Sequence, residues 1–129
     1  MGGLYSLPER NAIRDASLVA SVTAANTATL VYTLPYDGQT AIIRKVMVNN
    51  RQNAPVTVTF GTDLSATFAA QLPGLYAING QDNEWTQDQL PAYEWSSAIN
   101  VEVTAAAASP NDVQVMIEVE LFGGSSAHA

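Results

Sequence analysis

The chain carries few residue types that could perform nucleophilic or acid–base catalysis. It has no cysteine, and its single histidine, His128, stands second from the end of a Gly/Ser-rich stretch. A general base must be held within hydrogen-bond distance of its target, and a chain terminus holds a side chain poorly. We interpret His128 as a solvated tail residue. The sequence therefore predicts a non-enzymatic protein that uses no cofactor.

Acidic residues could support carboxylate or metal chemistry. Glu118 and Glu120 alternate with apolar residues, which is typical of a solvated or partner-facing strand face and not of a catalytic carboxylate pair. The densest group of oxygen ligands is Asp82-Asn83-Glu84 with Asp88. Calcium takes roughly six to eight oxygens, and this segment lacks EF-hand spacing. We expect an acidic surface loop and no metal, with a calcium site as the alternative.

Net charge limits the classes of partner. Twelve acidic residues face five basic ones, and the net charge is −7. The cations stand at three separate places in the sequence and form no basic stripe, so we expect neither direct nucleic-acid binding nor attraction to an anionic membrane. No run approaches the ~20 apolar residues of a membrane-spanning helix. Only 13% of residues are charged, so the surface is either covered by partners or simply rich in Thr and Asn.

Alternation of apolar and polar residues predicts strands throughout the chain. Gly61 is expected to end one of them, and Pro91 favours an edge position for another. Residues 79–89 read as a long polar loop around Trp85, and residues 63–70 as a short helix or an irregular strand. The predicted strands are residues 17–23, 27–34, 41–49, 56–60, 75–78, 90–95, 99–104 and 112–122.

The last of these strands has the clearest pattern. Its odd-numbered positions hold five aliphatic residues in succession, which a strand places on one face and a helix cannot. We expect this strand to be central, with residues 99–104 as its hairpin neighbour, and a polar residue at Val115 or Ile117 to be severely destabilising. The whole pattern predicts an all-β fold, an antiparallel β-sandwich of jelly-roll type with seven to eight strands.

The ends of the chain lack this alternation. We expect an extended N-terminal arm over residues 1–15, the sandwich domain over residues 16–122 and a flexible C-terminal tail over residues 123–129. The apolar residues of the arm need a surface to cover them, so we expect them to be partner-binding anchors. These anchors are Leu4, Tyr5, Leu7 and Ile13.

Several segments together resemble a known class of protein. A strand at residues 40–50 with a Val-x-Asn ending at Asn50 leads through a short polar loop to a Val/Thr strand that ends at Gly61. Residues 90–93, 99–103 and 113–120 follow the same plan. Over residues 27–122 the chain resembles small β-sandwich virion proteins of tailed phages, of the capsid-decoration (cement) or head-completion type.

The resemblance implies a structural protein that binds capsid subunits on the outside of a virion and stabilises their contacts. It also implies a homo-oligomer, a trimer being one such arrangement, assembled in the host cytoplasm. The alternative is a carbohydrate- or receptor-binding module, for example on a phage tail. Aromatic residues gather in the second half of the chain, and that alternative predicts that Trp85 or Trp95 is exposed.

Overall fold

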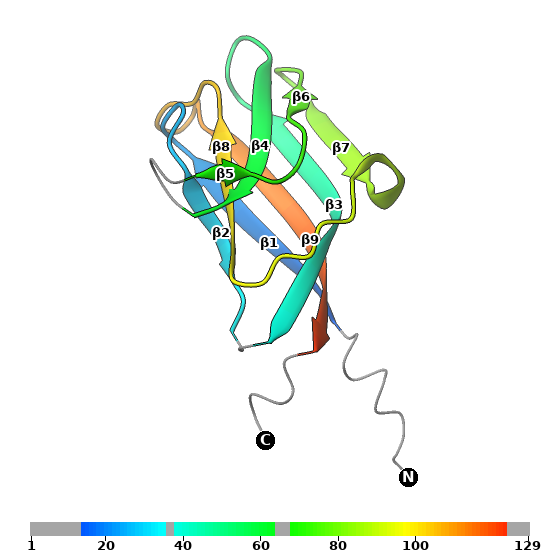
Figure 1. The fold of residues 1–129 in the computed structure, drawn as a ribbon. Helices are drawn as coiled ribbons and strands as arrows, with labels where there is room; N and C mark the ends of the chain where they lie inside the picture. The colour runs from blue at the N-terminus through cyan, green and yellow to red at the C-terminus, as the bar shows by residue number, and fades with distance from the viewer. Residues whose placement is uncertain (1–13, 36–37, 64–67, 124–129) are drawn as a thin grey trace.

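The computed structural model describes residues 14–35, 38–63 and 68–123, which form nine strands and one short 3-10 helix at Gln87–Gln89 (Figure 1). No helix in this part of the chain is long and apolar enough to cross a membrane. The strands are β1 (Arg14–Val22), β2 (Thr29–Thr33), β3 (Gln39–Asn50), β4 (Val56–Thr62), β5 (Ala69–Ala70), β6 (Leu75–Ala77), β7 (Asp82–Thr86), β8 (Ala98–Val103) and β9 (Val113–Gly123).

The strands form two packed antiparallel sheets. One has four strands in the order β1-β9-β3-β7, and the other has the order β2-β8-β4-β5, with β6 also paired to β4. Every pairing between the strands described is antiparallel. The predicted all-β antiparallel sandwich is confirmed, whereas its jelly-roll type stays a prediction.

Strand β9 lies between β1 and β3, so its predicted central position is confirmed. Four of its five odd-numbered aliphatic residues are completely buried, and Leu121 at the end is half-buried. The hairpin with residues 99–104 is wrong, because those residues form β8 in the opposite sheet. Alternation shows which face of a strand is buried, but it carries no information on which strand lies alongside.

The predicted polar loop at residues 79–89 is also wrong, since it contains β7. This strand pairs with β3 from Lys45↔Thr86 to Asn49↔Asp82. Asn83 and Trp85 are half-buried while Asp82, Glu84 and Thr86 are exposed. The open edge of the long strand β3 supplies backbone partners, and this tertiary pairing outweighs the low strand propensity of Asp and Asn.

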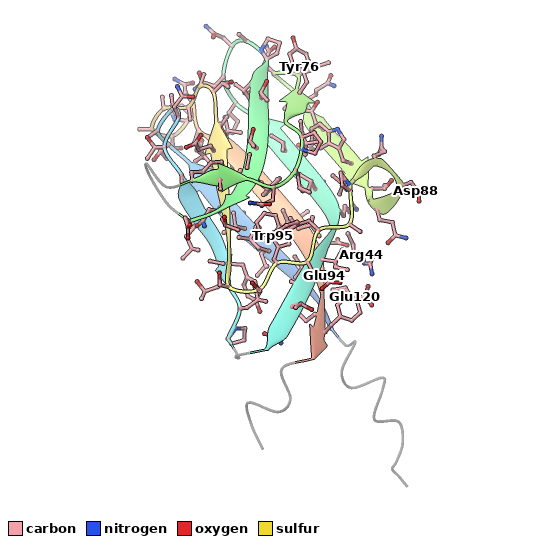
Figure 2. All side chains as sticks on the ribbon, in the orientation of Figure 1. Arg44, Tyr76, Asp88, Glu94, Trp95 and Glu120 are labelled. Carbon is pink, nitrogen blue, oxygen red and sulfur yellow. The ribbon has the colours of Figure 1, made fainter. Side chains whose placement is uncertain are left out.

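The predicted edge strand at residues 90–95 is instead a connection between the sheets. It makes a single bridge, in which the Ala41 and Trp95 amides each donate to the other's carbonyl at 2.9 and 2.8 Å. The Trp95 side chain is buried, and the Tyr93 ring packs edge-on against it with centroids 4.8 Å apart. Trp95 lies between the two sheets (Figure 2), so this segment closes the core without extending a sheet.

Gly61 does not end its strand, because β4 continues to Thr62 and pairs there with β5. A Cβ at Gly61 would lie 2.4 Å from the Ala69 carbonyl oxygen, so only glycine permits this close approach. The described part of this sheet runs from Arg14 to Gly123, and the division into arm, sandwich domain and tail stays a prediction. The remainder of the expected arm and tail lies outside the described residues.

We predict that Val115→Asp destabilises the protein by about 4 kcal/mol or more, because it places a carboxylate in a core with no cation to pair with it. Met116→Gln, the next residue on the opposite face of β9, should change the free energy of unfolding by less than about 1 kcal/mol. Urea denaturation followed by circular dichroism measures both. Equal losses for the two variants would contradict the sandwich register.

Candidate interaction surface

The outward-facing side chains of the four-stranded sheet form a continuous surface, which we call the outer face. A bulge in β3 defines its register: Ile43 pairs with Val119 and Lys45 with Glu118, so Arg44 is an extra residue. The buried positions of β3 are odd-numbered before Arg44 and even-numbered after it. The bulge therefore places Lys45, Met47 and Asn49 on the outer face.

An apolar row crosses the outer face from β1 to β3. Val19 pairs with Met116, Met116 pairs with Met47, and Met47 pairs with Glu84 on β7. Directly paired residues on one face of a sheet have side chains in contact range. Val19 is 67% exposed, and the two methionines are half-buried. We call these three apolar residues the outer row.

The outer row borders a shallow hollow of about 220 Å³. Met side chains are unbranched and flexible, so they adapt to varied partner shapes and are common at binding surfaces. The polar wall of the hollow comes from the next row of paired residues, Gln114, Asn49 and Asp82. An apolar floor with a carboxylate at the rim suits an apolar side chain that is flanked by a donor or a cation.

Ion pairs lie on the other side of the outer row. Lys45 Nζ lies 3.0 Å from Glu84 Oε2, and this hydrogen bond, together with the charge of Glu84, raises the pKa of Lys45. Arg44 Nε donates to Glu120 Oε1 at 2.7 Å, and Figure 2 shows the two labelled residues close together beside β3. These pairs are partly exposed, so they contribute little to stability. Their effect is to remove free positive charge from the outer face.

The third described ion pair has a buried acid, and it joins three parts of the chain. Asp112 is 2% exposed, accepts a hydrogen bond from the Ser21 hydroxyl of β1, and lies 3.2 Å from Arg51 Nε. Arg51 Nε also donates to the Pro110 carbonyl at 3.1 Å. The Ser21 hydrogen bond and, to a smaller extent, Arg51 lower the pKa of Asp112, although burial opposes them.

All cations with described side chains, Arg44, Lys45 and Arg51, are in these ion pairs. The described surface therefore offers no cluster of free cations for phosphate groups. The described residues also contain no group of three His, Cys, Asp or Glu side chains that could hold a metal ion.

Asn83 is held away from the other candidate calcium ligands of this segment, and the calcium alternative stays a prediction. Its side-chain amide donates to the Ile78 carbonyl at 2.9 Å, and its oxygen accepts from the Ile78 amide at 3.0 Å. The strand alternation of β7 directs Asn83 away from the exposed Asp82 and Glu84. Asn83 therefore lies on the opposite side of the sheet from Asp82 and Glu84, and Glu84 is paired with Lys45.

The described aromatic residues of the second half of the chain do not form a flat exposed platform. Trp95 is buried, and Trp85 and Tyr93 are half-buried against the core. Tyr76 on β6 is 65% exposed and lies at the end of the sandwich near β6 (Figure 2). The carbohydrate-binding alternative requires an exposed Trp85 or Trp95, and neither of these two residues is exposed.

The outer row was only partly visible in the sequence. Alternation places Met116 on the face of β9 that it shares with Glu118, and this prediction is confirmed. Val19 and Met47 come from strands whose register with β9 the sequence does not show. The anchors predicted in the arm, Leu4, Tyr5, Leu7 and Ile13, lie outside the described residues, so they stay a prediction.

Comparison with known proteins shows the fold and no family. No protein-family model matches the chain, and no curated protein matches it. A structure of Bacillus endospore appendages, described as disulfide-linked pili, is similar with a TM-score of 0.50 and 14% identity, over 95% of this chain and 97% of that one. This likeness agrees with the sandwich fold. The present chain has no cysteine, so disulfide linkage does not apply to it.

Two virus structures are similar at a lower level. The cyanophage Pam1 capsid asymmetric unit matches with a TM-score of 0.41 and 21% identity, over 95% of this chain and 91% of that one. Infectious bursal disease virus, Gt strain, matches with a TM-score of 0.32 and 9% identity, over 86% of this chain and 34% of that one. Both superpose too weakly to support an argument about this chain.

We predict that Asp112→Asn destabilises the protein by about 1–3 kcal/mol at neutral pH, because the Ser21 hydroxyl and the Arg51 guanidinium lose a charged acceptor that is itself buried. The lowered pKa of Asp112 means that its stabilisation is complete above about pH 4, the ordinary range of an aspartate, and is lost as the pH falls below it. The wild-type and variant unfolding free energies should therefore converge in acid. Denaturation from pH 7 to about pH 2 tests this, and Asp88→Asn is the exposed control.

Proposed function

We propose that this chain is a non-enzymatic structural subunit of a virion, which binds capsid subunits through protein–protein contacts and stabilises the particle from outside. In this proposal it acts as a decoration protein and as a homo-oligomer. Its mechanism is burial of apolar surface and strand addition, without a chemical step.

The outer row is the observation that carries this proposal. Val19, Met116 and Met47 form an apolar stripe across three neighbouring strands, next to a hollow with a mostly apolar lining. Exposed apolar side chains that gather in this way mark interaction sites more often than single exposed residues do. The cations beside the row are neutralised within the chain, which favours a partner recognised by shape and apolar contact.

The N-terminal arm is the second part of the proposed contact. Its four apolar anchors are Leu4, Tyr5, Leu7 and Ile13, and the first described strand, β1, continues directly from Ile13. Thirteen residues span up to about 45 Å when extended, which is enough to reach a neighbouring subunit. The similar fold in a structure of Bacillus endospore appendages, which are described as pili, agrees with a role in protein assembly.

We predict that removing residues 1–13 abolishes binding to the particle while the sandwich stays folded. Co-sedimentation with candidate capsids measures binding, and circular dichroism with thermal unfolding measures the fold. The matched control keeps the length of the arm and replaces Leu4, Tyr5, Leu7 and Ile13 by serine. Unchanged binding of both variants would contradict the anchoring role of the arm.

We predict that Met116→Glu weakens particle binding at least about tenfold, because a carboxylate in the outer row must lose its water on contact. The control is Leu30→Glu, since Leu30 is 48% exposed on β2 in the opposite sheet. Leu30→Glu should bind like the wild type in the same co-sedimentation assay. Equal binding of Met116→Glu and the wild type would reject the outer face as the contact surface.

A further inference from the structure

The edge strands of this sandwich differ in how well they are protected against pairing with another chain. Strand β7 has only five residues and carries two exposed acids, Asp82 and Glu84. Strand β2 also has five residues and is irregular, with a register shift between Leu30 and Tyr32. Short length, charge and irregularity are the features that natural proteins use to block edge-to-edge association.

The edge at β5 and β6 is protected by interruption. These strands have two and three residues, and both pair with β4. Pro73 and Gly74 lie between them, so no continuous row of backbone donors and acceptors forms along this edge.

Strand β1 lacks these protections over residues 16–22, beyond the charged Arg14 and Asp15 at its start. It pairs with β9 over nine consecutive residues without a register shift, and among the described residues β9 is its single strand partner. Residues 16–22 read Ala-Ser-Leu-Val-Ala-Ser-Val and contain no charge, proline or glycine. A long, regular and neutral edge of this kind is a template for a further strand.

We propose that β1 pairs in antiparallel orientation with β1 of a second copy of this chain, so that two four-stranded sheets become one continuous sheet across a two-fold axis. This inference rests on the protection of the strand edges and on the sequence of β1, and does not require the virion role proposed above.

The sequence of β1 is self-complementary, as a two-fold contact requires. With Val19 opposite Val19 of the second copy, Ser17 falls opposite Ser21, and Leu18 falls opposite Ala20. Ala16 then falls opposite Val22. Leu18 and Val22 thus each meet an alanine, the other pairs join identical residues, and no residue from 16 to 22 brings a charge to the contact.

Exposure and charge favour the same register. Val19 is 67% exposed and lies at the open end of the outer row, so pairing at Val19 would join the outer rows of the two copies. The net charge of −7 opposes contact between most surfaces of two copies. Along residues 16–22 of β1, two copies of the chain can approach without placing carboxylates opposite one another.

The test is a charge swap at residue 19, measured by sedimentation velocity over a dilution series of the full chain. The wild type should dimerise. Val19→Lys and Val19→Glu should each raise the dimer dissociation constant about tenfold or more, because two like charges face each other across the axis. An equimolar mixture of the two variants should recover a dimer, since only a Val19↔Val19 register pairs the lysine with the glutamate. Val19→Thr, a neutral β-branched control, should dimerise like the wild type.

Several results would overturn the proposal: a wild-type monomer at every concentration, variants that dimerise unchanged, or a mixture that stays monomeric. Loss of the dimer on removal of residues 1–13 would also overturn it, because the arm would then be the added strand. Circular dichroism of each variant checks that the sandwich is folded. A dimer that forms normally but does not bind particles would reject the virion role and leave the β1 contact standing.

Discussion

The inward face of β9 packs into the space between the two sheets, and most other features of the molecule follow from this packing. Its four fully buried aliphatic residues lie in the same core as Phe60 of β4 and the inward side chains of β8. Complete burial of such a side chain contributes roughly 1.5–3 kcal/mol before entropy is counted. Since β9 pairs with β1 on one side and β3 on the other, its position also defines the register of the outer face.

Polar residues inside the domain hold the strand ends in place. Asn50 is fully buried and donates to the carbonyls of Ala54 and Ala77 at 2.9 and 3.1 Å, while its oxygen accepts from the Gln52 amide. Asp112 has a similar role beside Ser21 and Arg51. The Asn50 contacts satisfy backbone groups of three other residues, whereas those of Asp112 join the side chains of β1 and the β3–β4 loop. The loops are thus ordered by their own chain, whereas the outer row and the edge of β1 have no equivalent cover within the described residues.

The surface proposed for binding could be predicted only in part. Alternation alone places Met116 on the outside of β9, because a period of two is a local property of a strand. The neighbours of Met116 depend on the pairing of β9 with β1 and β3, which lie far from it in the sequence. The bulge at Arg44 adds to this difficulty. The switch of apolar residues from odd to even positions is visible in the sequence, but the backbone decides which residue is extra.

The sequence by itself determined the fold class, the approximate positions of the long strands and the buried face of β9, since these depend on side-chain alternation and turn residues close together in the chain. Only the tertiary structure decided that residues 82–86 form a strand, that residues 90–95 connect the sheets, and that β8 and β9 lie in opposite sheets. Each of these outcomes depends on a backbone hydrogen bond or a packing contact with a distant segment. A local pattern cannot specify such a partner, because many segments of similar polarity could supply it equally well.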